Sequence, residues 1–295
     1  MEPQPPPPPP PPPQPHMQPF SAAQLDAAAA QLIDTGAVLL KGVLPPGLVR
    51  EMRARFEPEL SSLVDGTRER KPNEASGDGS TPNRNGFPGG PNRGPQRWFM
   101  SADLVQPYLA VLEATPLLGL MARVFGDDDI ALTNIGSDTP LGRGSAFQEW
   151  HQDGGGTWNY RGEERIWRLG VRVPLVDVVD APPERTNGPV EIIPNTVEMP
   201  IAEALERVSR GELSVARTPH AVGDIEVFNP RVVHRGSPNE TDVPRYLLAF
   251  TFQPVAHLEA NGAVGGGASA PSIAEQQLNT LSPRAQRMVR LLPRL

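Results

Sequence analysis

Two short stretches of the sequence contain side chains that can bind a metal ion, and the first is "EWHQDGGG" at residues 149–156. It places His151 and Asp153 two positions apart. In an extended strand, side chains at i and i+2 project to the same face, so these two can point at one spot while Gln152 turns away. The chain has no cysteine, which leaves His, Asp and Glu as its metal ligands.

The second stretch is "HRGSPNETDVPR" at residues 234–245. His234 ends an apolar run, where a strand would deliver it toward a site, and two imidazoles with one carboxylate form the facial set that suits non-haem Fe(II). Arg245 carries a charged fork that can hold both oxygens of a carboxylate. Taken singly, each histidine could be structural and Arg245 could form a surface salt bridge. Their combination with His151 and Asp153 among β-type runs favours a metal site that also binds an organic anion.

The composition argues against several classes of function. The net charge is -7, the isoelectric point is near 5.3 and the basic residues form no long run, which argues against nucleic-acid binding. No run of apolar residues approaches the length of about 18 that a membrane span needs. The proline-rich start does not resemble a secretory signal, so a cytoplasmic protein is expected. The final "PRL" resembles a peroxisomal address only loosely.

The sequence predicts four segments of different character. They are a polyproline tail at 1–19, a globular domain at 20–255, a flexible linker at 256–270 and a C-terminal helical segment at 271–295. The unbroken prolines from Pro5 to Pro13 favour a solvated polyproline II tail. We interpret this tail as a disordered leader, with docking to an SH3- or WW-type module as the alternative.

The first part of the domain is predicted to be helical. A helix capped by Ser21 is followed by a short strand at Ala37–Leu40 and by a second helix opened by Pro45 and Pro46. Residues 66–97 are rich in Gly, Pro, Asn and Arg without hydrophobic periodicity, which indicates either a lid over a site or a disordered loop. The segment "LVQPYLAVLEATPLLGLMARVFG" then has apolar residues at helical spacing.

Short β-type runs dominate from Ile130 onward, each bounded by Gly, Pro, Asn or Asp. They are "IALTNIG", "WRLGVRVPLVDVV", "PVEIIP", "DIEVFN" and "RYLLAFTFQP". Such a series predicts an antiparallel sandwich or barrel. Near the C-terminus, Ser282 and Pro283 are suited to the cap and first turn of a last helix.

Over about residues 20–255 the chain resembles the phytanoyl-CoA dioxygenase family of Fe(II)- and 2-oxoglutarate-dependent oxygenases. The resemblance rests on "FSAAQLDAAAAQLIDTGAVLLKGVL" near the start, "HQD" at 151–153, "NGPVEIIPNT" at 187–196 and "HRGSPNETDVPR" at 234–245. It implies a mainly β protein with flanking helices, built on a double-stranded β-helix of the jelly-roll, cupin-like type.

The resemblance also implies roles for individual residues. The Fe(II) ligands would be His151, Asp153 and His234. Arg245 would hold the distal carboxylate of 2-oxoglutarate, and Thr133 or Asn134 would supply a polar contact to it from the preceding strand. Asn187 and Gly188 would form the turn before a core strand. These assignments predict a complete site for iron and 2-oxoglutarate.

Other residues are expected to meet the substrate. Trp158 is predicted to line the substrate pocket, and the arginines of the Gly/Pro-rich stretch, Arg84, Arg93 and Arg97, could meet an anionic substrate. Family members often carry serine two positions after the distal histidine, where this chain has Gly236, with Ser237 one position later. A hydroxyl contact to the co-substrate is therefore not assigned at this position.

The expected function is Fe(II)- and 2-oxoglutarate-dependent hydroxylation, with dioxygen as co-substrate, of a small-molecule or acyl substrate. The carboxylate of Asp153 fills the position that halogenating relatives leave empty for halide, which favours hydroxylation. One alternative is a non-catalytic binding module that retains the fold. The other is a cupin-type metal enzyme that does not use 2-oxoglutarate. The position of Arg245, inside the fold or on its surface, distinguishes the alternatives.

Overall fold

A computed structural model of the chain describes residues 20–68, 97–101, 104–153, 166–180, 182–261 and 271–294. Several predictions concern residues outside these ranges. They are the polyproline tail at 1–19, residues 69–96 of the predicted lid, and the pocket residue Trp158.

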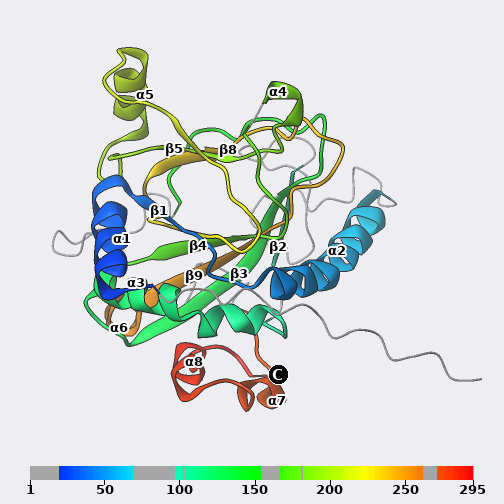
Figure 1. Cartoon of the computed structure of the whole chain (residues 1–295), viewed down its shortest axis with the longest axis vertical. Helices are drawn as coiled ribbons and strands as arrows, with labels where there is room; N and C mark the ends of the chain where they lie inside the picture. Colours follow the sequence, from blue (N-terminus) through cyan, green and yellow to red (C-terminus); the bar gives the residue numbers. More distant parts are fainter. Residues whose placement is uncertain are drawn as a thin grey trace, which may run out of the picture.

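Two antiparallel sheets face each other and form a double-stranded β-helix (Figure 1). The larger sheet has the strand order β1-β7-β4-β9-β3-β2. Its strands are β1 (Ala37–Leu40), β7 (Ile225–Phe228), β4 (Leu169–Pro174), β9 (Leu247–Pro254), β3 (Ile130–Pro140) and β2 (Arg97–Ser101). The smaller sheet consists of β6 (Ala216–Thr218), β5 (Val190–Ile193) and β8 (Val233–Gly236). The predicted β-barrel class is confirmed.

The register of the larger sheet separates an apolar face from a polar one. One row of paired residues runs across the sheet through Ile135, Phe250, Val171, Val227 and Val38. The next row, on the opposite face, runs through Gly136, Ala249, Arg172, Glu226 and Leu39. Because side chains alternate between faces along a strand, the first row joins the main apolar core and the second faces the smaller sheet. The interior between the sheets therefore contains charged side chains, Arg172 and Glu226, beside a small apolar cluster that includes Phe228 and Ile192.

Helices cover the apolar face of the larger sheet (Figure 1). Helix α1 (Ala22–Thr35) begins at Ser21, whose hydroxyl accepts from the Gln24 amide while the Gln24 side chain accepts from the Ser21 amide. It ends at Gly36, whose φ of 88° favours glycine. Its buried side chains, Leu25, Ala28, Ala29 and Leu32, recur at helical spacing and join the core shared with α3 (Thr115–Phe125) and the 3-10 helix η2 (Tyr108–Glu113).

The remaining helices lie outside the barrel. They are α2 (Pro46–Arg68), α4 (Pro182–Arg185), α5 (Ile201–Ser209), α6 (Val255–Asn261), α7 (Glu275–Leu278) and α8 (Pro283–Met288). Helix α8 begins as predicted, with the Ser282 hydroxyl accepting from the Ala285 amide. None of the helices in the described ranges is long and apolar enough to cross a membrane.

Two predicted boundaries are wrong. The linker at 256–270 does not begin at 256, because helix α6 continues to Asn261; Val255 and Leu258, one turn apart, are buried together against Ala131. The predicted loop at 66–97 begins inside helix α2, which extends to Arg68, and ends in β2, whose first residue is Arg97. Arg97 is completely buried rather than part of an exposed loop.

Candidate active site

Two histidines lie side by side on paired backbone segments. The partly exposed group that they form with Asp153 is called the mouth of the barrel below. His151 and His234 form an isolated antiparallel bridge in which each backbone amide donates to the other's carbonyl at 3.0 Å. Side chains of directly paired residues project to the same face, and the two ring centroids are 4.3 Å apart. Strand β8 supplies His234, and the His151 segment adds a fourth short strand beside it. Main-chain pairing therefore sets the spacing of the two imidazoles.

Asp153 completes a group of three candidate ligands. Its amide donates to the Pro230 carbonyl at 2.8 Å, which returns the chain toward His234. The carboxylate lies 3.8 Å from Nε2 of His151 and 3.7 Å from Nε2 of His234. One ligand atom from each residue lies within 4.8 Å of the others. Two ligands on one ion span up to about 4 Å when each bond is about 2 Å, so both carboxylate–imidazole distances are compatible with a shared metal.

Each imidazole is fixed in the orientation that metal binding requires. Nδ1 of His151 lies 2.8 Å from the Glu149 carbonyl, and Nδ1 of His234 lies 2.8 Å from the Val232 carbonyl. A carbonyl oxygen can only accept a hydrogen bond, so Nδ1 carries the proton in both rings. Nε2 is then left with its lone pair directed toward Asp153. Both histidines thus direct Nε2 toward the Asp153 carboxylate.

The segments that carry the ligands are tied together by side-chain hydrogen bonds. Gln152 points away from the metal group, and its Nε2 donates to the carbonyls of Thr196, Met199 and Arg231. The hydroxyl of Thr196 donates to the Ile193 carbonyl at 2.6 Å and accepts from the Val233 amide at 2.9 Å. Residues 151–153 and the start of β8 are therefore both attached to the turn that follows β5.

The charges at the mouth favour a cation. Burial lowers the pKa of His234 to about 4, so its imidazole is neutral at neutral pH. Partial burial raises the pKa of Asp153, but the nearby His234, His151 and Arg168 outweigh it and hold that pKa below its ordinary value. Asp153 is therefore ionised, and its side chain is 46% exposed. An ionised carboxylate beside two imidazoles is a suitable donor set for a divalent metal.

The aromatic ring of Phe228 lies between His234 and the charged side chains of the interior. Phe228 lies edge-on to the His234 ring, at 5.5 Å between centroids, and the Arg172 guanidinium stacks over Phe228 at 3.6 Å. Phe228 covers Gly170 so closely that a Cβ there would lie 2.2 Å from the ring. Arg172 in turn donates to the buried carboxylate of Glu226 at 2.7 Å. The polar interior thus connects the metal group to a cluster of charged side chains.

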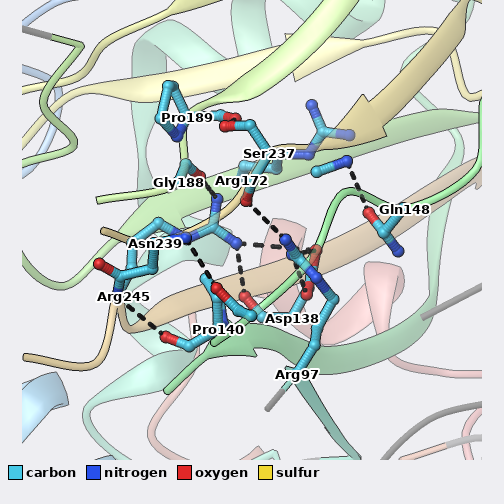
Figure 2. Close-up of polar contacts among 12 residues, drawn as sticks. Arg97, Asp138, Pro140, Gln148, Arg172, Gly188, Pro189, Ser237, Asn239 and Arg245 are labelled. Atoms are coloured by element: carbon cyan, nitrogen blue, oxygen red, sulfur yellow. Dashed lines mark hydrogen bonds and ion pairs between the residues drawn. The ribbon is translucent and has the colours of Figure 1, made fainter. Parts of the chain in front are cut away.

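Arg245 lies at the inner end of this cluster and is 1% exposed. Its guanidinium donates to the Gly188 carbonyl and, at 2.8 Å, to the Asp138 carbonyl (Figure 2). Gly188 has a φ of 88°, and a Cβ there would lie 3.0 Å from the Ser237 carbonyl, so the Asn187-Gly188 turn requires glycine. Burial lowers the pKa of Arg245 to about 10, which still leaves it cationic at neutral pH.

The two predicted co-substrate contacts are neighbours at an irregularity in β3. Thr133 lies at a β-bulge, and its hydroxyl donates to the Thr251 carbonyl at 3.3 Å. Asn134 follows the bulge on the interior face, and its Oδ1 is buried without a hydrogen-bond partner among the described residues. Of the two, Asn134 is the one with an acceptor available to a ligand. Trp158, Arg84 and Arg93 lie outside the described residues.

Sequence reasoning missed most of the inner charged cluster. Arg172 and Glu226 are charged residues within otherwise apolar strands, "LGVRVP" and "IEVF", and this was the signal that could have identified them. His220 is also buried, with Nε2 3.8 Å from the Glu226 carboxylate. No sequence pattern pointed to Asp138, because its role depends on its contacts with Arg97 and Arg245, which are distant in the sequence. Arg97 was predicted to lie in the Gly/Pro-rich loop, where it could meet an anionic substrate.

Comparison with known families and structures is consistent with this geometry. The family model described as "Phytanoyl-CoA dioxygenase (PhyH)" matches residues 33–246, which is most of the chain and includes all the site residues above. A search of curated protein sequences gives no match.

Solved structures share the fold at low sequence identity. The α-ketoglutarate-dependent epimerase SnoN from nogalamycin biosynthesis is 18% identical, with 87% of this chain and 98% of that chain covered and a TM-score of 0.54. The carbocyclase SnoK from the same biosynthesis is 16% identical, with 86% and 99% covered and a TM-score of 0.56. EctD from S. alaskensis, solved with 2-oxoglutarate and 5-hydroxyectoine, is 18% identical, with 80% and 78% covered and a TM-score of 0.53.

Proposed function

The chain belongs to the phytanoyl-CoA dioxygenase family, and from that premise we propose that it is an Fe(II)- and 2-oxoglutarate-dependent dioxygenase that hydroxylates an unactivated C–H bond of a small-molecule or acyl substrate. Succinate and CO2 would be the co-products. One observation carries the proposal. A group of two histidines and one aspartate at the mouth of the barrel shares a polar interior with a buried arginine, Arg245.

The residues at the mouth fit Fe(II). His151 and His234 offer Nε2 atoms, and Asp153 offers an ionised carboxylate, which together form the two-histidine, one-carboxylate set of non-haem iron oxygenases. The half-exposed side chain of Asp153 leaves the mouth open to ligands from solvent. Thiolate or three-histidine sites, which suit other metals and cupin chemistry, are not formed by the described residues.

The residues at the inner end fit a carboxylate. Arg245 uses two of its five N–H donors on neutral carbonyls, and its Nε has no partner among the described residues. A buried cation with free donors is a favourable partner for the distal carboxylate of 2-oxoglutarate. From the interior face of β3, the Asn134 side chain would contact a carboxylate through its amide N–H group, since its Oδ1 can only accept.

Iron, 2-oxoglutarate and dioxygen, when bound together, supply the oxidising power for inserting one oxygen atom into the substrate. The protein's own contribution is to bind and orient them. His151, Asp153 and His234 would hold the metal, and Arg245 would fix the far end of 2-oxoglutarate. The buried wall formed by Phe228 and Gly170 would exclude water from the side of the site that faces the larger sheet.

Two other functions are less well supported. A binding module without catalysis has no need for both imidazoles to be oriented by carbonyls, yet both are. A metal enzyme that does not use 2-oxoglutarate has no need for a charged arginine at the inner end of the barrel, yet Arg245 is buried there. Among dioxygenase outcomes, hydroxylation is favoured over halogenation because Asp153 fills the third ligand position.

Anaerobic titration tests the proposal. Adding Fe(II) and then 2-oxoglutarate to the purified protein should produce a metal-to-ligand charge-transfer band, and admitting dioxygen should release succinate. Supplying candidate substrates should then give a product heavier by one oxygen atom. The band should be absent in His151→Ala and retained in Asp242→Asn, an exposed surface change. A missing band in the unaltered protein, or its survival in His151→Ala, would overturn the proposal.

A further inference from the structure

The inner end of the barrel contains more positive than negative charge. Among the described residues there, the guanidinium groups are those of Arg97, Arg172 and Arg245, and the carboxylates are those of Asp138 and Glu226. Three positive and two negative charges leave one positive charge uncompensated. All three arginines are buried, at 0%, 7% and 1% exposure respectively. An unpaired buried charge is costly, so this cluster is suited to receive one anionic group.

The two carboxylates are already assigned to particular arginines. Glu226 accepts from Arg172 at 2.7 Å. Asp138 accepts from Nη1 of Arg97 at 2.9 and 3.1 Å through its two oxygens, whereas its nearest approach to Arg245 is 3.6 Å (Figure 2). A separation of 3.6 Å is too long for a hydrogen bond. The partners of Arg245 within hydrogen-bond distance are neutral carbonyls, so Arg245 is the arginine whose charge remains available.

We infer that Arg97 is a positioning residue for the co-substrate: it holds the Asp138 carboxylate and so prevents Asp138 from neutralising Arg245. The inference rests on the proposed function, in which Arg245 binds the distal carboxylate of 2-oxoglutarate. Asp138 is a competitor within the same chain, because its carboxylate is chemically equivalent to the ligand group. Without Arg97, Asp138 closes on Arg245 and occupies the donors that 2-oxoglutarate needs.

The Arg97 guanidinium packs against the last residue of strand β8 and the residue that follows it. Nη2 of Arg97 donates to the Ser237 carbonyl at 2.7 Å. A Cβ on Gly236 would lie 2.5 Å from Nη1 of Arg97 and 2.6 Å from Oε1 of Gln148, which accepts from the Gly236 amide at 2.7 Å. The missing side chain of Gly236, two residues after His234, therefore creates the space that the Arg97 guanidinium fills. This explains why glycine rather than serine stands at this position.

The test is a pair of variants and their combination, with 2-oxoglutarate affinity measured anaerobically from the charge-transfer band and by calorimetry. Arg97→Gln should weaken 2-oxoglutarate binding by about 10- to 100-fold, the loss expected when a charge-assisted contact is blocked. Asp138→Asn should bind at least as tightly as the unaltered protein. The double variant should recover affinity to within about threefold, because the competitor is gone. Fe(II) affinity should be unchanged throughout, and Arg143→Gln, which breaks an exposed Arg–Asp pair, is the matched control.

A purely structural role for Arg97 predicts a different pattern. In that case the double variant would bind 2-oxoglutarate no better than Arg97→Gln, and this result would overturn the inference. Loss of affinity in Asp138→Asn alone would also overturn it, since Asp138 would then be assisting Arg245. If Arg97→Gln does not fold, Arg97→Lys with and without Asp138→Asn provides the same comparison.

A measurement without 2-oxoglutarate separates this inference from the proposed function. A crystal structure of Arg97→Gln should show the Asp138 carboxylate within hydrogen-bond distance of Arg245, about 2.9 Å instead of the present 3.6 Å. If the unaltered protein gives no charge-transfer band, the proposed function fails, and this structure still decides whether Arg97 restrains Asp138. An Asp138 carboxylate that stays in place without Arg97 would contradict the inference directly.

Discussion

The two ends of the barrel interior are built on different principles. At the mouth, His151 and His234 are aligned by main-chain pairing and oriented by carbonyls close in sequence, and the Asp153 side chain is half-exposed. At the inner end, Arg97 and Arg245 are sealed from solvent. Their positions are set by side chains and carbonyls from strands far apart in sequence.

This difference reflects the ligands that the two ends suit. A cation can be bound at an open mouth, because the donor atoms themselves provide most of the affinity and exchange with solvent is needed for loading. A carboxylate gains most from a cation in a low-dielectric interior, where charge interactions are strong, but any resident carboxylate there competes with it. The mouth therefore depends on spacing, and the inner end depends on the distribution of charge.

Removing a ligand at the mouth should have the largest effect on activity and little effect on folding. In Asp153→Ala we expect Fe(II)-dependent succinate release to fall by about a thousandfold or more, since loss of one metal ligand removes several kcal/mol of binding and transition-state stabilisation. Thermal unfolding of the metal-free protein should barely change, because the side chain is half-exposed. Asp242→Ala, at a surface aspartate, is the control, and equal losses in both variants would contradict the assignment.

A substitution at the inner end should weaken 2-oxoglutarate binding without weakening Fe(II) binding. In Arg245→Gln we expect 2-oxoglutarate affinity to fall by about 100-fold, because hydrogen bonds to a charged partner are lost. Fe(II) affinity should be retained, since the mouth is built separately. Stability should also fall by about 2 kcal/mol, because the buried carbonyls of Gly188 and Asp138 lose a donor. Calorimetry of both ligands provides the measurement, and a parallel loss of Fe(II) binding would show that the two ends are not independent.

The same difference governs what could be predicted from the sequence. The grouping at the mouth could be predicted because the i, i+2 rule is local and only a few histidines were available. The strands and the caps at Ser21 and Ser282 could be predicted from patterns of a few residues. The inner end could not, because the pairing of Arg97 with Asp138 depends on the register of β2 on β3, which is set by contacts across the whole sheet.

Local composition is also misleading after the last strand. The Gly-rich run "GAVGGGASA" suggested a linker from residue 256, but the preceding "VAHLEAN" places apolar Val255 and Leu258 one turn apart. Their burial against Ala131 stabilises a helix there. A turn of helix can thus follow the last strand directly, before the glycines begin.

Acid should lower the free energy of unfolding of the metal-free protein, because His234 is protonated more readily in the unfolded chain. The pKa of His234 is about 4 when folded and 6.5 when exposed, so between these values the unfolded chain binds more protons. This contribution to stability is complete above about pH 6.5 and is lost as the pH falls toward 4, with about 2 kcal/mol lost between pH 7 and pH 5. Denaturant unfolding at a series of pH values should show this slope, and His234→Asn should reduce it.

Part of the slope should remain in His234→Asn. Burial also lowers the pKa of His220, although nearby Glu226 opposes this, so His220 contributes in the same direction. An unchanged slope in His234→Asn would mean that the mouth does not hold this imidazole in its neutral form. In contrast, Arg245, whose pKa is about 10, stays cationic over this range and should contribute nothing to the slope.

The smallest expected effect concerns the residues that hold the mouth in place without binding the metal. The Thr196 hydroxyl accepts from the buried Val233 amide, immediately before His234, and donates to the Ile193 carbonyl. Thr196→Val keeps the side-chain shape but removes both hydrogen bonds. The start of β8, and with it His234, is then no longer fixed to the turn that follows β5. We expect Fe(II) affinity to fall by about tenfold, the lower end of the range for residues that orient metal ligands.

The control for Thr196→Val is the same substitution at Thr280, an exposed threonine whose hydroxyl donates to a carbonyl of the C-terminal segment. Fe(II) titration by calorimetry should distinguish the two variants, while 2-oxoglutarate affinity at saturating Fe(II) should be equal in both. If Thr196→Val instead weakened 2-oxoglutarate binding at saturating Fe(II), the tie would extend along β8 to Gly236 and Arg97. The metal site and the 2-oxoglutarate site would then be coupled through β8, and the two ends of the barrel would not be independent.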